Sequence, residues 1–258
     1  MIFMTLELVD ILQGSFSLIF VCISLVIGFT ILSKYSQHKS RLYILVGLSW
    51  IGIANPYFPD SISFVMNILF QQSLPVDWYM IIGNVFIPIA LLCWLIAYTD
   101  MINKKRQTLV VTLTIIFSLL FEIAFFFIFF TDITQIGVIV PSRPFTVEFG
   151  LFITIYLLLV ILILLITGIK FSQKSIRSKE KDIRVKGKLL RAAFISFTVA
   201  AIMDSLLGMI FEDPTDPLLA ILVVATRLLL ISSALEFYGG FILPKWMHAI
   251  FVKPEKQE

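Results

Sequence analysis

Long apolar segments dominate the chain, and short polar links separate them. A helix that spans a bilayer needs about 20 mostly apolar residues, and seven segments approach or exceed that length. They cover residues 12–33, 41–57, 78–99, 107–130, 147–169, 189–211 and 218–240. The pattern predicts an all-α polytopic membrane protein with seven transmembrane helices, which form a single domain over residues 1–258.

Two further apolar stretches are too short to span. Residues 61–70 would reach only about 15 Å as a helix, and they follow the sequence NPYFPD, whose prolines are expected to end the preceding helix. Residues 245–252 place aromatic and aliphatic side chains at helical spacing. We expect both stretches to be short helices that lie at the membrane surface.

The composition agrees with this pattern. Hydrophobic residues make up 59% of the chain and charged residues 14%, and the mean hydropathy is +0.99. Soluble domains carry roughly 45–50% apolar and about 25% charged residues. The composition therefore excludes a large soluble domain beside the apolar segments and predicts a multi-pass protein of the cell membrane.

The basic residues predict the orientation. Of the 20 Lys and Arg, all but Arg143 and Arg227 fall in the links after the first, third and fifth predicted helices or after the last one. Because basic loops stay in the cytoplasm, we expect the N-terminus outside and the C-terminus inside. The basic 170–191 link is a candidate docking surface for a cytoplasmic signalling partner; the alternative is an anchor to anionic lipid.

Three ionisable residues lie deep in the predicted spans. Counted inward from the outer helix ends, Asp204 is about 10 Å deep, Glu122 about 12 Å and Arg227 about 14 Å. Asn84, four residues before Pro88, lies about 9 Å deep, and its carbonyl cannot accept a bond from that proline. Glu236 is nearer the cytoplasmic end of its helix, where it can reach the interface.

Arg227 is expected to pair with an acid, because an unpaired charge in hydrocarbon is unfavourable. Asp204 is the nearer candidate through the short link between its helix and the next, and Glu122 is the other. Asn84, Glu122, Asp204 and Arg227 are therefore the candidate site. One interpretation is a structural clamp; the other is an outward-facing polar pocket or a step on an ion path.

An enzyme is the least favoured class. The two histidines, His38 and His248, lie in predicted cytoplasmic segments, and the chain has neither an HExxH motif nor a Gly-rich phosphate loop. Residues 218–240 contain no lysine that could carry retinal as a Schiff base. We expect no metal, no cofactor, no retinal and no nucleic-acid partner, and a lipid bilayer as the surrounding medium.

Two stretches carry a resemblance to known proteins: KDIRVKGKLLRAAF, which enters the sixth predicted helix, and FYGGFILPKW, which leaves the seventh. They resemble uncharacterised archaeal seven-helix membrane proteins, and the general plan resembles the seven-helix sensor modules of histidine kinases. The resemblance implies a sensor. Because no kinase or cyclase domain follows Glu258, such a sensor would signal through a separate partner.

Three functions stay open at this point. The first is a stand-alone sensor or receptor-like protein that binds a small ligand from the outer side. The second is a small-solute transporter or a proton or cation pathway that uses the excess carboxylates. The third is a non-catalytic membrane scaffold, in which the intramembrane charges only hold helices together.

Overall fold

The computed structural model describes residues 6–140, 143, 146–211, 213 and 215–252. Within these residues the helices are α1 (Leu8–His38), α2 (Arg41–Ile53), α3 (Phe58–Phe70), α4 (Val76–Asn84), α5 (Ile87–Ile102), α6 (Gln107–Thr131), α7 (Leu151–Ile176), α8 (Lys181–Ile210), α9 (Pro217–Phe241) and α10 (Lys245–Phe251). Short 3-10 turns η1 (Asn55–Tyr57), η2 (Lys104–Arg106) and η3 (Ile133–Gln135) join some of them, and β1 (Gly137–Ile139) and β2 (Val147–Phe149) are the strands.

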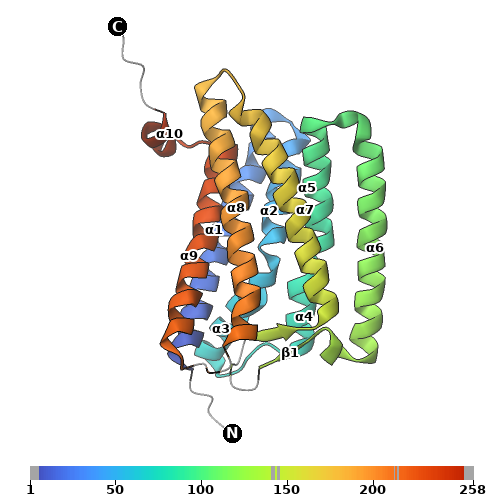
Figure 1. The fold of residues 1–258 in the computed structure, drawn as a ribbon, viewed down its shortest axis with the longest axis vertical. Helices are drawn as coiled ribbons and strands as arrows, with labels where there is room; N and C mark the ends of the chain where they lie inside the picture. The colour runs from blue at the N-terminus through green and yellow to red at the C-terminus, as the bar shows by residue number, and fades with distance from the viewer. Residues whose placement is uncertain (1–5, 141–142, 144–145, 212, 214, 253–258) are drawn as a thin grey trace.

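Seven helical segments of the described chain are long and apolar enough to cross a membrane, which confirms the number predicted from the sequence. α1, α6, α7, α8 and α9 each provide one span, while α2 with α3 and α4 with α5 provide the other two. The segments run side by side as one bundle, with α6 at its edge (Figure 1). The chain is therefore a multi-pass membrane protein.

The second span is longer than the sequence analysis predicted. Residues 61–70 are not a separate surface helix: η1 and α3 continue α2, and the combined segment Arg41–Phe70 is 30 residues long. Pro56 and Pro59 each stand in the first turn of a new helical element. Proline is tolerated there because its missing N–H has no partner within that turn. The prolines thus break the helix without ending the span.

The third span is divided near Pro88, the proline that cannot donate a hydrogen bond to the carbonyl of Asn84. α4 ends at Asn84 and α5 begins at Ile87, with Pro88 in its first turn. The side-chain amide of Asn55 donates a hydrogen bond to the carbonyl of Ile82 close to this break. The breaks in the second and third spans are thus joined by one polar contact.

A small β-hairpin supplements the predicted all-α fold. β1 and β2 pair in antiparallel register, with Gly137 opposite Phe149 and Ile139 opposite Val147. The hairpin lies in the link between α6 and α7, at the end of the bundle where α1 begins (Figure 1). Its connecting loop contains Arg143, which reaches back to the helices.

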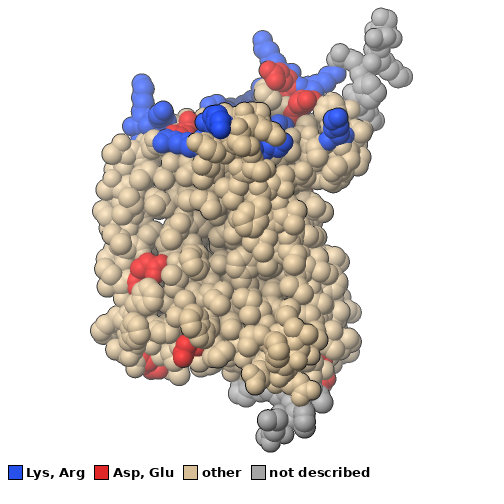
Figure 2. Space-filling view, turned by 180° about the vertical axis from the view of Figure 1, so that it is seen from behind, with Lys and Arg blue, Asp and Glu red and all other residues tan. Residues whose placement is uncertain are grey.

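The two ends of the bundle differ in charge. Figure 2 shows Lys and Arg gathered at one end and few charged residues over the rest of this face. We call the end formed by residues 34–41, 102–107, 170–191 and 245–252 the basic end. The acidic end is formed by residues 6–10, 70–77, 131–140, 143, 146–150, 210–211, 213 and 215–217. The short helix predicted near residues 245–252 is confirmed as α10, at the basic end.

Candidate functional site

Arg227 lies inside the bundle, in α9, and its side chain is 1% exposed. Its Nη1 donates a hydrogen bond to Oδ2 of Asp204 in α8 at 2.9 Å. The pairing predicted between these two residues is therefore confirmed. The Asp204 side chain is 27% exposed, so the ion pair has one fully enclosed partner and one that reaches the surface of the bundle.

The second acid beside Arg227 is Asp60, the last residue of NPYFPD, which the sequence analysis expected to lie at the membrane surface. Arg227 Nη2 donates to Asp60 Oδ2 at 3.4 Å, and the Asp60 side chain is 8% exposed. Asp60 is in the first turn of α3. Because α3 continues the second span, this turn lies within the bundle and the carboxylate is enclosed by α1, α4 and α9.

Polar partners surround the Asp60 carboxylate. The Tyr79 hydroxyl of α4 donates to Oδ1, and Nε2 of Gln13 in α1 donates to Oδ2 at 3.3 Å. The ring of Tyr57 lies under the Arg227 guanidinium, with its centroid 5.0 Å from Cζ. A cation over an aromatic face is favourable, more so when both are removed from water. The charges of the Asp60 carboxylate and the Arg227 guanidinium are thus each balanced by more than one neighbouring group.

The contacts continue from Gln13 to the hairpin loop. Arg143 Nη2 donates to Gln13 Oε1 at 2.6 Å, and Arg143 Nε donates to Asp10 Oδ1 at 3.0 Å. Both Asp10 and Arg143 are buried, at 0% and 7% exposure. One unbroken series of hydrogen bonds and ion pairs therefore runs from the loop after β1 to Asp204.

We call this set of residues the charge network. Its members are Asp10, Gln13, Tyr57, Asp60, Tyr79, Arg143, Asp204 and Arg227. It contains three aspartates and two arginines, so it carries one excess negative charge when all are ionised. Removing one member of a buried ion pair leaves its partner uncompensated, and this is strongly destabilising. The network therefore fixes α1, α3, α4, α8, α9 and the hairpin loop relative to one another.

Asn84 and Glu122 do not join the charge network in the described part of the chain. The buried Asn84 side chain donates to the Met80 carbonyl of its own helix at 2.9 Å. Glu122 is half-buried in α6, and no hydrogen-bond partner of its Oε2 is found among the described residues. Glu122 was the alternative partner of Arg227; the described ion pairs of Arg227 go to Asp204 and Asp60.

Glu122→Leu is expected to leave the free energy of unfolding unchanged or to raise it by about 1 kcal/mol, because it removes a buried carboxylate oxygen that lacks a partner. Thermal unfolding in detergent, with Glu148→Leu on β2 as the matched loss of a carboxylate, measures this. A decrease of roughly 2 kcal/mol or more, beyond that of Glu148→Leu, would show that Glu122 has a stabilising partner after all.

The side chains of the charge network pack against one another and line neither of two hollows on the described surface. One hollow lies between α8 and α10 at the basic end, the other between α1 and α9 around Cys22 and Trp246. Among the members, Asp204 has the most exposed side chain, at 27%.

Comparison with known proteins adds no relative: no protein-family model, curated protein or solved structure matches the chain. Among the described residues, no group of three or more His, Cys, Asp or Glu side chains has a geometry that could hold a metal ion. The charge network and the charge difference between the two ends of the bundle are therefore the features that bear on function.

Proposed function

We propose that the chain is a membrane sensor, with the charge network as its input and the basic end as its output. The proposed orientation places the acidic end outside and the basic end in the cytoplasm, because basic loops stay in the cytoplasm. The resemblance of the plan to the sensor modules of histidine kinases supports the same function. A separate cytoplasmic partner would receive the signal at the basic 170–191 segment.

One observation carries the proposal: the Asp204–Arg227 ion pair joins α8 and α9, two of the helices that reach the basic end. α8 is continuous from Lys181 to Ile210, so Asp204 and Lys181 are about 35 Å apart along one helix. α9 leads within a few residues into α10. Because packed helices shift as rigid elements, a change in this ion pair is transmitted to the basic end.

The excess charge indicates the class of input. Three carboxylates face two guanidinium groups in the charge network, and Asp204 is its partly exposed member. A small cation that binds Asp204 competes with Arg227 for that carboxylate and compensates the excess charge. We therefore expect the input to be a small cationic species, with the proton as the smallest case.

Asp204→Asn tests the sensor, because it neutralises the carboxylate as a bound cation would. With spin labels at Lys179→Cys and Ile250→Cys, and Cys22 and Cys93 replaced by serine, pulsed electron-spin resonance measures the distance between the start of α8 and α10. We expect Asp204→Asn to shift this distance by about 1–2 Å, as in helix movements of known switches.

Asp77→Asn is the matched control, because Asp77 is an exposed carboxylate at the same end of the bundle and lies outside the charge network. It is expected to leave the label distance unchanged. If the Asp204→Asn distribution coincides with that of the unmodified protein, the ion pair does not control the basic end and the sensor proposal fails.

A proton pathway is the second candidate, and buried hydroxyl groups favour it. Among the described residues, the hydroxyl oxygens of Ser17, Ser24, Ser49 and Thr226 are buried without a hydrogen-bond partner. Ser24 is about 10 Å further along α1 than Ser17, so polar groups continue beyond the charge network. Proton flux into proteoliposomes that is abolished by Asp204→Asn would favour this function over the sensor.

A further inference from the structure

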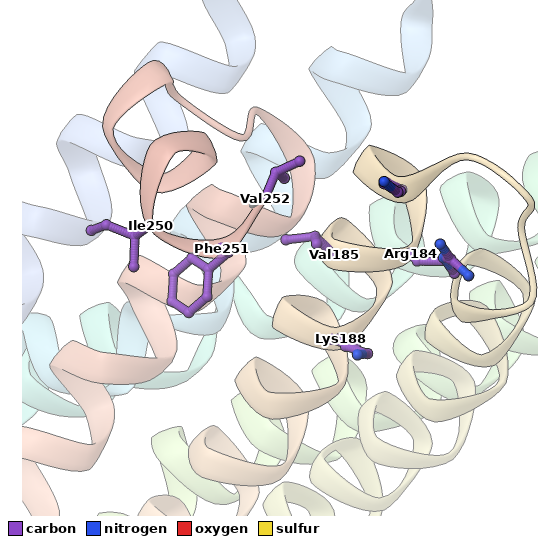
Figure 3. A pocket seen from close by; sticks show the side chains of 7 residues that line it. Arg184, Val185, Lys188, Ile250, Phe251 and Val252 are labelled. Carbon is purple, nitrogen blue, oxygen red and sulfur yellow. The ribbon is translucent and has the colours of Figure 1, made fainter. Parts of the chain in front are cut away.

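A hollow at the basic end combines positive charge with an apolar wall. It has a volume of about 630 Å³ and lies between α8 and α10 (Figure 3). The α8 side contributes Lys181, Arg184, Val185 and Lys188, and the α10 side contributes Ile250, Phe251 and Val252. We call it the α8–α10 groove. It shares no residue with the charge network.

The α8 wall presents cations on one helix face. Lys181, Arg184 and Lys188 are three and four residues apart, a spacing that places side chains above one another along a helix. No ion-pair partner of Arg184 or Lys188 is found in the described part of the chain, and both are exposed. The nearest acid on α8 is Asp182, whose Oδ1 lies 3.2 Å from Nε2 of His248. Arg184 and Lys188 therefore leave uncompensated positive charge on this wall.

The α10 wall is apolar, and the opposite side of α10 packs against α9. Met247 is 4% exposed and packs against Gly239, where a Cβ would lie 2.4 Å from the Met247 sulfur. On the other side of α10, Ile250 is 63% exposed and Phe251 51%. With Trp246, which is also exposed, they form the apolar face of a short helix. Such helices lie in the plane of a membrane interface.

We propose that the α8–α10 groove binds the headgroup of an anionic phospholipid, with its phosphate on Arg184 and Lys188 and its acyl chains along Ile250 and Phe251. Basic pockets at the cytoplasmic ends of transmembrane helices bind such headgroups. A free phosphate ion would use the cationic wall alone, whereas a phospholipid uses both walls. The proposal goes beyond the proposed sensor function and does not depend on the charge network.

Native mass spectrometry of the purified full-length protein in neutral detergent tests the site. The probes are phosphatidylglycerol and phosphatidylcholine with the same acyl chains. Phosphatidylglycerol is expected to bind more tightly, and Arg184→Gln with Lys188→Gln is expected to weaken it about 25-fold, roughly fivefold for each charge removed near an anionic headgroup. Phe251→Ser, which changes no charge, is expected to weaken it as well.

Lys104→Gln with Lys105→Gln is the matched control, since both residues are exposed at the basic end in η2, outside the groove. It removes the same charge and is expected to keep the affinity of the unmodified protein. Equal losses in the two double variants would overturn the proposal in favour of diffuse attraction. Inorganic phosphate that displaces the lipid, with Phe251→Ser binding normally, would overturn it in favour of a free phosphate. Binding of poly-glutamate in place of phosphatidylglycerol would overturn it in favour of an acidic protein segment.

Discussion

Arg227→Leu is expected to lower the free energy of unfolding by about 3–5 kcal/mol, the cost of leaving buried charges without their partner. The substitution strands Asp60, which is 8% exposed, and removes the ion pair with Asp204. It also removes the cation from the face of Tyr57. Equilibrium unfolding of the purified protein in mixed micelles, followed by tryptophan fluorescence, measures the loss.

Arg41→Leu is the matched control, because Arg41 also contacts an aspartate through two hydrogen bonds, to Asp100 at 2.9 and 2.7 Å. Its side chain is 60% exposed, and solvent screens such a pair. We expect a loss far smaller than that of Arg227→Leu. Equal losses for the two substitutions would mean that burial does not set the strength of the Arg227 contacts.

Asp60→Leu is expected to be as costly, at about 3–5 kcal/mol. It removes the acceptor of Tyr79, Gln13 and Arg227 together. Asp60→Asn keeps an oxygen at the same position and is expected to cost less, because the side-chain oxygen can still accept from Tyr79. The same unfolding measurement compares the two variants.

Asp77→Leu provides the reference for Asp60→Leu, since Asp77 is in the first turn of α4 at the same end but is exposed. A surface substitution of this kind usually changes stability by no more than about 0.5 kcal/mol. If Asp60→Leu were as mild as Asp77→Leu, Asp60 would have to lie at the membrane surface, as the sequence analysis placed it, and the extended second span would be wrong.

The number of spans follows from the sequence because hydrophobic length is a local property of each segment. The pairing of Arg227 with Asp204 follows as well, because α8 and α9 are joined by a short link and must lie side by side. The burial of Asp60 beside Arg227 cannot be predicted from the sequence, since NPYFPD fits the end of a helix and the start of a new helical turn equally well. The buried polar partners of Asp60 distinguish these two possibilities, and they come together only in the folded bundle.

Arg143 and Glu122 show the other limit of the sequence. Arg143 and Asp10 are separated by 133 positions, and nothing local in a loop residue reveals that it folds back onto α1. Glu122 was grouped with Arg227 because the two share a depth, but depth fixes only one coordinate. The order of helices around the bundle decides contact, and α6 lies at its edge (Figure 1).

A set of double-mutant cycles around Arg227 tests the charge network most directly. Arg227→Leu is combined in turn with Asp60→Leu, Asp204→Leu and Glu122→Leu, and the free energy of unfolding is measured for every variant. Residues in one ion-pair network show interaction energies of about 0.5–3 kcal/mol, whereas distant sites add to within about 0.5 kcal/mol. We predict interaction with Asp60 and Asp204 and additivity with Glu122. Interaction with Glu122, or additivity with Asp60, would contradict the charge network described here.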